Sequence, residues 1–294
     1  MLSAFTDTQK GIFFSFAGFS IYAISDASAK WLTAFYTPFE VVAWMYLFSL
    51  VFCILCAPIL GGFPKTLRTT KLKFHLGRSV SNLVLAVFAV MGFSHLSLAA
   101  AYTIFFLAPF LITILAVPLY QEHVEKKNWL VIAAGFSGVL IAFPPGADLF
   151  NPWVLVTFIA MLCVAALGLL ARPLGREETL LSLSFYPNLI NTVVLLPPVL
   201  MTGHIPSWPH LVLFMISGAC LTLGLSFVAN SYRLARFSVV APFHYSQIIW
   251  GLLFGYIIFG DKPEIQMLVG AAIIIGSGIY LIESERRACR KVVF

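Results

Sequence analysis

Two stretches of this chain contain no charged residue and are too long for a single membrane helix. Residues 79–121 cover 43 positions without Asp, Glu, Lys or Arg, and residues 179–232 cover 54. A soluble domain has about a quarter of its residues charged, whereas here charged residues are 10% of the chain and hydrophobic residues 60%. The chain is therefore predicted to be an integral membrane protein. This excludes a disordered chain, a disulfide scaffold, a coiled coil and a soluble enzyme.

Apolar runs of this length predict ten membrane spans. A spanning helix needs about 20 mainly apolar residues, so each long run holds two spans, with turns near residues 94–97 and 203–209. Glycine, proline and polar residues favour a turn at both places. The runs lack two-residue alternation, which favours helices over a barrel. The remaining spans are expected at residues 11–32, 41–64, 128–147, 149–171, 237–260 and 265–282.

The distribution of the basic residues predicts which of the two possible orientations these spans adopt. With ten spans, 16 of the 18 Lys and Arg residues fall in loops on one side, and that excess marks the cytoplasmic side. Both termini are then expected in the cytoplasm of a bacterial inner-membrane protein. The 16 residues are Lys10, Lys65, Arg68, Lys71, Lys73, Arg78, Lys126, Lys127, Arg172, Arg176, Arg233, Arg236, Arg286, Arg287, Arg290 and Lys291.

One competing interpretation concerns the N-terminus. Lys10, the apolar residues after it and the sequence 27–29 imitate a secretory signal with its cleavage site. Asp26 lies directly beside that site, and cleavage would leave nine spans and disturb the alternation of loops. We therefore favour an uncleaved first span.

The second half of the chain repeats the pattern of the first. In each half a proline-containing span leads into an acidic hairpin at Glu122 or Asp261, and a span with close glycines follows. The offset is about 140 residues, so residues 1–147 and 148–294 are predicted to be two five-helix repeats. Because five is odd, the halves have opposite orientations, an arrangement that recurs in secondary transporters with a substrate site between the repeats. The glycines themselves are expected only to pack helices.

Three segments carry a resemblance to a known family. They are Gly135-Phe-Ser-Gly138, Ala241-Pro242-x-x-Tyr245 with Phe259-Gly260-Asp261-x-Pro263, and Gly270-Ala-Ala-x-Ile-Ile-Gly276-Ser-Gly278. With the two repeats they resemble the EamA type of the drug/metabolite transporter superfamily, over essentially the whole chain. Within it the chain looks most like bacterial amino-acid exporters of the aromatic (YddG) kind. The family often has a basic residue seven positions after the proline of the second span, where this chain has Met45.

Asp26 and Lys30 are the two charges that lie clearly inside an expected span. An ionisable residue inside the membrane costs roughly 2.5–3.5 kcal/mol to insert and is a functional candidate by default. The two residues are four apart and share one helix face, so they can pair. One interpretation is a structural ion pair, with Lys30 reaching toward the outer surface. The other is that the pair binds the ammonium and carboxylate of a zwitterionic substrate.

The ninth span carries a second group of polar and aromatic candidates. Pro242, His244, Tyr245, Gln247 and Trp250 lie in an otherwise apolar helix. Trp250 is about 12 Å deeper than Pro242 at 1.5 Å per residue, too deep for an interfacial belt. A proline also releases a backbone carbonyl that can accept a bond from a substrate. We therefore expect this helix to line the pathway.

Further candidates are polar residues in the middle of other spans, which either join helices or contact substrate. Together with the residues above, the predicted pathway residues are Tyr22, Asp26, Lys30, Asn82, Tyr102, Asn230, Pro242, His244, Tyr245, Gln247 and Trp250. The helices that the resemblance implies around a central cavity are spans one, three, four, six, eight and nine.

The predicted function is export of small amphipathic metabolites, most simply amino acids including aromatic ones, by alternating access. The alternative within the same superfamily is metabolite import or efflux of cationic drugs, for which the acidic Asp26 is suited. A membrane-embedded enzyme would need clustered acids or histidines at one depth, and a channel would show no saturable counterflow. No phosphate loop, metal motif or catalytic triad is found. The expected partners are a small-molecule substrate and membrane lipid, without cofactor, metal or nucleic acid, and a monomer suffices.

Overall fold

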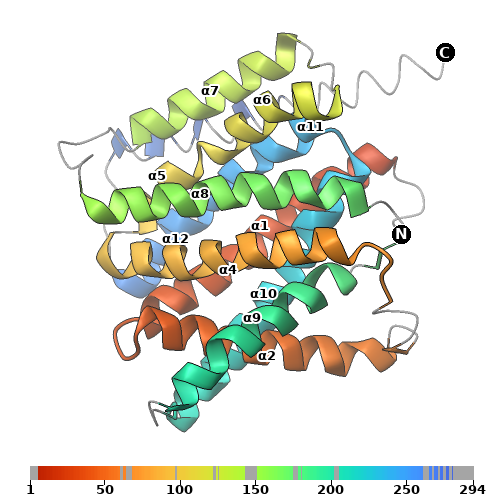
Figure 1. The fold of residues 1–294 in the computed structure, drawn as a ribbon. Coiled ribbons are helices and arrows are strands. Elements are labelled where there is room, and N and C mark those ends of the chain that lie inside the picture. The colour runs from red at the N-terminus through yellow and green to blue at the C-terminus, as the bar shows by residue number, and fades with distance from the viewer. Residues whose placement is uncertain are drawn as a thin grey trace.

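The computed structural model is a bundle of helices lying side by side (Figure 1). It describes residues 6–59, 62–63, 68–96, 98–121, 124, 126–142, 151–174, 178–179, 181–201 and 205–260, and ten residues between 265 and 280. Every element in this part of the chain is helical. Seven helical spans there are long and apolar enough to cross a membrane, which confirms a multi-pass membrane protein. The count of ten spans stays a prediction.

The helices follow one another along the chain with short connections. They are α1 (Asp7–Leu32), α2 (Pro38–Ile59), α4 (Leu72–His95), α5 (Leu98–Phe105), α6 (Ala108–Tyr120), α7 (Lys126–Ala142), α8 (Pro152–Ala171) with η3 (Arg172–Leu174), α9 (Ser182–Met201), α10 (Trp208–Leu234), α11 (Phe237–Val240), η4 (Ala241–Ser246) and α12 (Gln247–Phe259). The turns expected near residues 94–97 and 203–209 fall between α4 and α5 and between α9 and α10. The span expected at 265–282 lies largely outside the described residues.

The third span begins earlier than the charge-free run. It was expected from residue 79, but α4 already starts at Leu72. Its first two turns therefore contain basic residues, and Arg78 lies about 9 Å into the helix at 1.5 Å per residue. The assignment of Arg78 to a cytoplasmic loop was wrong. Membrane helices can begin in such polar sequence when neighbouring helices bury the polar side chains.

Two of the spans are interrupted at the same tripeptide. Ala108-Pro109-Phe110 opens α6 after a turn at Phe106 and Leu107, and Ala241-Pro242-Phe243 opens the 3₁₀ segment η4 before α12. A proline has no N–H to give to the preceding turn, so the helix is readily broken there, while proline is well tolerated at the start of a new helix. The span expected over residues 237–260 is present at Phe237–Phe259, with a 3₁₀ segment inside it.

Small residues bring α1 and α10 together along much of their length. A Cβ on Gly11 would lie 2.7 Å from the Cβ of Ala235, and one on Gly18 would lie 2.8 Å from a methyl of Val228. Gly224 of α10 accommodates the ring of Tyr22 in the same way. In membranes, close packing of this kind replaces the hydrophobic driving force between helices. It holds α1, and with it Asp26, in a defined place.

A buried polar network joins α2, α9 and α10. Ser49 and Thr222 are linked by their hydroxyls at 2.6 Å, and the Asn188 amide donates to Ser49 at 2.6 Å. Ser184 extends the network by donating to the Thr222 carbonyl at 2.9 Å. These bonds connect helices away from the central cavity, so Asn188 serves to join helices.

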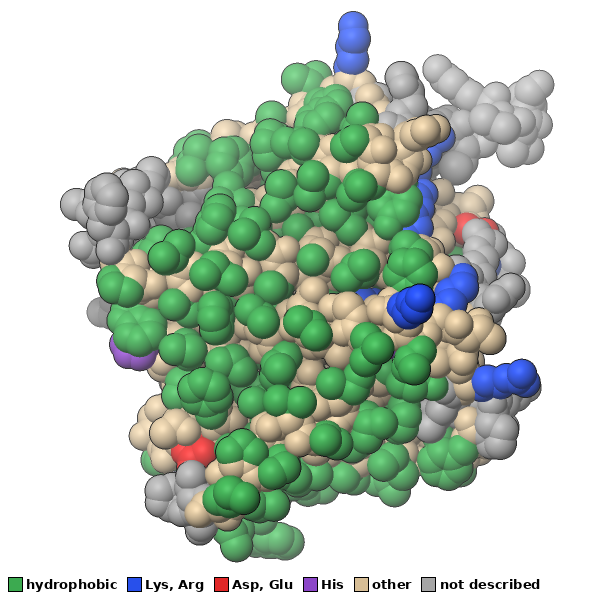
Figure 2. All heavy atoms as spheres, in the orientation of Figure 1, with side chains coloured by type: hydrophobic (Ala, Val, Ile, Leu, Met, Phe, Trp, Pro, Cys, Tyr) green, Lys and Arg blue, Asp and Glu red, His purple; other side chains and the backbone are tan. Residues whose placement is uncertain are grey.

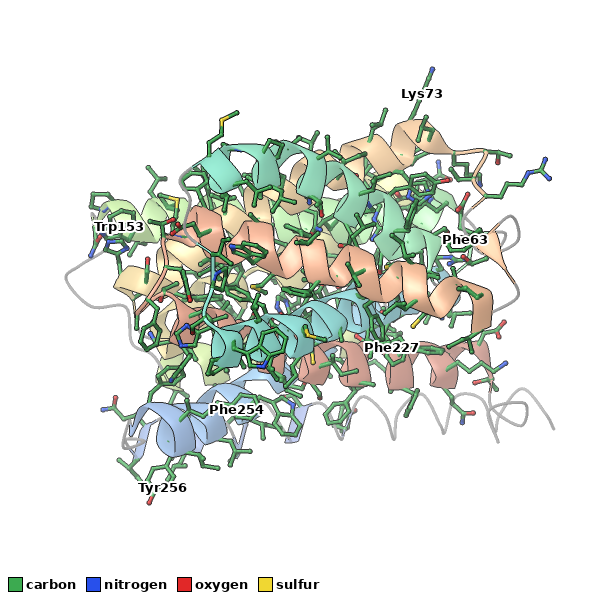
Figure 3. The ribbon with its side chains drawn as sticks, turned by 90° about the horizontal axis from the view of Figure 1, so that it is seen from below. Phe63, Lys73, Trp153, Phe227, Phe254 and Tyr256 are labelled. Atoms are coloured by element: carbon green, nitrogen blue, oxygen red, sulfur yellow. The ribbon has the colours of Figure 1, made fainter. Side chains whose placement is uncertain are left out.

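The surface of the bundle agrees with a membrane environment. Figure 2 shows a face that is almost wholly apolar, with Lys and Arg gathered at the end where α4 begins in Figure 1. In Figure 3, Lys73 and Phe63 lie toward that end, and Trp153 lies at the other. Trp153 stacks on His95 with ring centroids 3.5 Å apart. Basic side chains gathered at one end of an apolar bundle are the pattern on which the expected orientation rests.

Candidate functional site: a cavity between the helices

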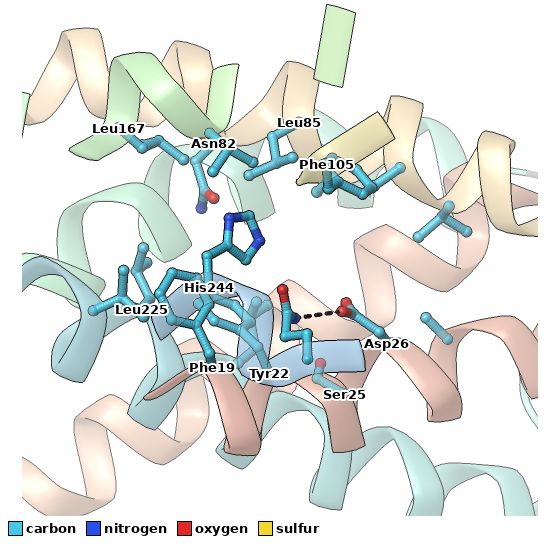
Figure 4. Close-up of a pocket in the computed structure, with 18 of the residues that line it drawn as sticks. Phe19, Tyr22, Ser25, Asp26, Asn82, Leu85, Phe105, Leu167, Leu225 and His244 are labelled. Carbon is cyan, nitrogen blue, oxygen red and sulfur yellow. Dashed lines mark hydrogen bonds between the residues drawn. The ribbon is translucent and has the colours of Figure 1, made fainter. Parts of the chain in front are cut away.

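A central cavity lies among α1, α2, α4, α5, α8, α10, η4 and α12. Its empty space is about 1000 Å³, counting the solvent at its opening. Figure 4 shows His244 lying between Phe19 and Tyr22 of α1 on one side and Asn82 of α4 on the other. Most of the wall is apolar, with a few polar groups at separate places, which is the usual make-up of a small-molecule site.

Six of the predicted pathway residues line this cavity, and five do not. The lining set is Tyr22, Asp26, Asn82, Tyr102, His244 and Gln247. The residues outside the lining are Lys30, Asn230, Pro242, Tyr245 and Trp250. The family resemblance implied spans one, three, four, six, eight and nine around the cavity. The helix α2 also borders it, and the structure selects the face of each helix that lines it.

Asp26 is the acidic residue of the cavity wall. Its carboxylate accepts a hydrogen bond from the Tyr102 hydroxyl at 3.1 Å and one from the Gln247 amide at 3.3 Å. The second of these bonds is drawn in Figure 4. Tyr102 belongs to α5 and Gln247 begins α12, so one carboxylate joins α1 to both interrupted spans. Both donors are neutral, so they stabilise the carboxylate without cancelling its charge.

The side chain of Lys30 contacts groups other than Asp26. Its ammonium donates to the carbonyl oxygens of Phe93 at 3.2 Å and Leu96 at 3.0 Å, where α4 ends, and lies 5.5 Å from the centre of the Phe259 ring. A cation at the C-terminal end of a helix is favourable because the last carbonyls are unpaired there. The expected pairing of Asp26 with Lys30 is thus replaced by two separate sets of contacts.

Aromatic rings form flat walls in the middle of the cavity. The rings of Phe19 and His244 stack with centroids 4.4 Å apart and an angle of 14° between their planes. Among the lining residues, Tyr102 also meets Phe93 edge-on at 6.3 Å, and behind the lining the ring of Phe106 meets His244 edge-on at 6.0 Å. Ring pairs of this kind offer a planar, rigid surface to another ring. The cavity is therefore suited to a substrate that carries an aromatic or heteroaromatic group.

The remaining candidates of the interrupted spans have packing roles. Tyr245 fills the space beside Gly135, where a Cβ would come within 2.6 Å of its ring, and packs edge-on against Phe106. Trp250 donates from its indole N–H to the Ser20 hydroxyl at 2.8 Å. Pro242 is buried in η4. These contacts hold η4 and α12 against neighbouring helices. They therefore support the position of the cavity wall without being part of its lining.

The sequence analysis missed Arg78, which lines the cavity and is only 1% exposed. Its Nη1 donates to the Leu183 carbonyl at the start of α9, at 3.2 Å. The sequence offered one indication of Arg78: the predicted pathway residue Asn82 comes four residues later, so the two residues share a helix face. If the third span had been predicted to begin near Leu72, with two polar turns before the apolar run, Arg78 would have been placed inside it.

A buried polar cluster lies below Arg78, at the end of the bundle where α4 begins. Glu178 accepts hydrogen bonds from Thr69 at 2.5 Å, Ser182 at 2.8 Å and His75 at 3.3 Å. Burial of the carboxyl opposes ionisation, but these hydrogen bonds outweigh it and lower the pKa of Glu178 below its ordinary value. The backbone carbonyl of Glu178 also accepts a bond from Arg233 at 2.7 Å. The cluster ties α4 to α9 and α10.

Comparison with known proteins identifies the family of this membrane chain. The model of the EamA-like transporter family matches residues 9–143 and again residues 151–283. The chain belongs to the EamA-like transporter family. It is accordingly a membrane transporter, and transporters of this family act on small molecules carried across the bilayer. A solved crystal structure superposes with a TM-score of 0.71 over 96% of this chain and 98% of its own, at 15% identity, and so shares the fold.

Two kinds of named relative match nearly the whole transporter. The S-adenosylmethionine uptake transporter of Rickettsia conorii is 26% identical over 91% of this chain and 90% of its own length. The riboflavin transporter of Brucella anthropi is 26% identical over 93% of this chain and 99% of its own length. Neither relative is named for export of amino acids, so the predicted match to exporters of the YddG kind is not supported.

The geometry of the cavity suits binding and passage of a substrate. Among the described residues, no group of three or more His, Cys, Asp or Glu side chains is placed to hold a metal ion. The polar groups of the wall are hydrogen-bond donors, one carboxylate and one guanidinium, set among aromatic rings. They can orient a ring-bearing molecule of mixed polarity by hydrogen bonds and charge.

Proposed function

We propose that this transporter imports a ring-bearing metabolite of the size of S-adenosylmethionine or riboflavin across the bacterial inner membrane. The observation that carries the proposal is the cavity itself, in which the acidic Asp26 lies beside flat aromatic walls. The names of the relatives favour uptake over the amino-acid export first expected from the sequence. Import was the alternative within the same superfamily, and it now takes precedence.

S-adenosylmethionine is the favoured probe because its chemistry matches the wall. It carries a sulfonium cation, a heteroaromatic base and an amino-acid end. The carboxylate of Asp26 accepts bonds from two neutral donors, so these donors leave its negative charge to be matched by a cation in the cavity. A buried charge of this kind is costly unless it is matched. A cationic group on the substrate would supply the match.

We further propose that residues 1–147 and 148–294 act as two inverted repeats with both termini in the cytoplasm. Three observations support this: the family model matches each half separately, both halves contain a span interrupted at Ala-Pro-Phe, and the basic side chains gather at one end. In alternating access the repeats would rock about the cavity. Asp26 bonds to a residue from each interrupted span and would lie where they meet.

The test is uptake into liposomes that contain the purified protein. Radiolabelled S-adenosylmethionine, riboflavin, phenylalanine and a cationic dye are offered in parallel, with and without a pH gradient. Saturable uptake or counterflow of S-adenosylmethionine or riboflavin supports the proposal. Transport of phenylalanine alone restores amino-acid export, and transport of the dye alone indicates efflux of cationic drugs.

Orientation has its own test. Single cysteines at residues 68 and 206, in a protein whose native cysteines are replaced, are labelled from either side of intact cells. Residue 68 is expected to be protected from an impermeant reagent, and residue 206 to be accessible. The reverse result would contradict the proposed orientation.

A further inference from the structure

Arg78 is a buried cation that has no carboxylate counter-ion among the described residues. The groups that interact electrostatically with it are Tyr22, His75 and Arg233, and no carboxylate is among them in the described part of the chain. The ion pairs there are Lys10 with Asp7 and His75 with Glu178. Burying an unpaired charge costs several kcal/mol, so natural proteins nearly always compensate it. Arg78 therefore calls for a partner.

The guanidinium also has donors to spare. Nη1 is used by the Leu183 carbonyl, whereas Nε is buried with no acceptor among the described residues. The side-chain amide of Asn82, four residues on, likewise has its nitrogen buried with no acceptor in that part of the structure. Both residues line the cavity from the same face of α4. The Arg78 guanidinium and the Asn82 amide thus present N–H donors without acceptors next to a positive charge. Such a group forms a site for an anion, since the planar fork of a guanidinium fits carboxylate and phosphate.

The anion site and Asp26 lie at different levels along the bundle. Their separation follows from Lys30 and Phe93, less the one turn of about 6 Å between Asp26 and Lys30. Lys30, one turn beyond Asp26, bonds the carbonyl of Phe93. Arg78 precedes Phe93 by 15 residues of α4, or about 22 Å along the helix at 1.5 Å per residue. Their long side chains shorten this gap, and Tyr22 interacts electrostatically with both Asp26 and Arg78. A substrate that satisfies both ends must be elongated.

We propose that Arg78 and Asn82 form an anion-binding subsite of the transport cavity, which receives the carboxylate or phosphate of an elongated substrate whose other end faces Asp26. The proposal rests on the proposed transport function and names the substrate class more closely. The ring of the substrate would lie between the two ends, beside the Phe19–His244 stack. Arg78 would contact the substrate directly, and its bond to Leu183 would keep it in position.

Equilibrium binding to the purified protein tests the subsite with two matched pairs of probes. The first pair is S-adenosylmethionine and its decarboxylated analogue, which differ by the carboxylate. The second is riboflavin 5′-phosphate and riboflavin, which differ by the phosphate. Since a bond to a charged group contributes about 1.5–3 kcal/mol, the wild type should bind the member with the carboxylate or phosphate about tenfold or more tightly in at least one pair. The pair that shows the preference identifies the anion.

Variants assign this preference to Arg78. Arg78→Gln should bring the ratio of the two dissociation constants close to one, and Arg78→Lys, which keeps the charge without Nε, should give an intermediate ratio. Arg172→Gln is the matched control, because Arg172 lies over the rings of Tyr120 and Phe237 outside the cavity. It should retain the wild-type ratio. If Arg78→Gln does not fold, the wild-type ratio and Arg78→Lys still decide.

The outcomes separate this inference from the transport proposal. Equal binding of both members of each pair by the wild type, or a preference that survives in Arg78→Gln, overturns the subsite while the transported substrate stands. A preference that depends on Arg78, without uptake of the member of either pair that lacks the carboxylate or phosphate, supports the subsite and narrows the function to substrates with such a group. Failure of the wild type to bind any of the four probes overturns both.

Discussion

The charged residues at the two ends of the cavity differ in how far the protein satisfies their hydrogen bonds. Asp26 accepts hydrogen bonds from two helices, and these bonds are already formed. Arg78 has one bond to a carbonyl and an Nε with no acceptor in the described chain. The Asp26 end is preorganised by the protein, whereas the Arg78 end is completed by what enters it. The difference indicates that a binding residue is better recognised from the bonds it lacks than from its charge alone.

Removing the Asp26 charge should have the largest effect. Asp26→Asn keeps the size of the side chain and loses the charge that a cationic substrate would meet. We expect binding of S-adenosylmethionine to weaken by about 10- to 100-fold, since bonds to charged groups contribute roughly 1.5–3 kcal/mol. Competition binding at constant ionic strength measures the change. A fall of the same size for uncharged riboflavin would show that Asp26 is needed only for structure, and the contrast between the ends would disappear.

The stability contributed by the Glu178 cluster, at the end of the bundle where α4 begins, should fall in acid. The pKa of Glu178 is lowered on folding, so its ionised form stabilises the folded protein above the ordinary pKa of a glutamate, near 4.5, and this contribution is lost as pH falls below that value. Glu178→Gln should lower the free energy of unfolding at pH 7 by about 1–3 kcal/mol, because it disturbs three buried hydrogen bonds. Thermal unfolding from pH 7 down to about pH 3 should show a smaller acid-dependent loss of stability in the variant. A parallel pair of curves would refute the role of Glu178.

The donors that preorganise Asp26 should contribute less than its charge. Tyr102→Phe removes one hydroxyl from the carboxylate, and a single hydrogen bond contributes about 0.5–1.5 kcal/mol. The expected loss in affinity for a cationic substrate is about 2- to 13-fold. Tyr120→Phe is a suitable comparison, because the Tyr120 hydroxyl donates to the Leu169 carbonyl at 2.6 Å and Tyr120 is outside the cavity lining. If both variants lose affinity equally, the Tyr102 bond has no special part in preorganising Asp26.

The smallest effect on selectivity is expected at Trp250, which contacts Ser20 outside the cavity lining. Trp250→Phe should lower stability by about 1 kcal/mol through the lost hydrogen bond and shift all substrates alike. Relative uptake of aromatic and non-aromatic substrates by the variant checks this. A selective loss of aromatic substrates would bring Trp250 back into the pathway, as the sequence first indicated.

Much of the membrane organisation could be read from the chain alone. The charge-free runs identify a multi-pass protein, and both turns expected inside the long runs lie between helices. This succeeds because insertion into a bilayer depends on the summed hydrophobicity of about 20 consecutive residues, which is a local property. The three quoted segments were also sufficient to indicate the EamA-like family. The substrate and the direction of transport were not accessible in this way.

What the tertiary structure alone decided is the set of partners of each polar side chain. Asp26 and Lys30 are close in sequence, yet Asp26 bonds Gln247, 221 residues away, and Lys30 bonds Phe93, 63 residues away. Arg78 was assigned to a loop because a basic residue at the edge of an apolar run usually lies there. Packing of α4 against α9 buried it instead. Hydropathy is set by neighbours along the chain, whereas a hydrogen bond within the membrane is chosen by whichever helix packing brings into reach.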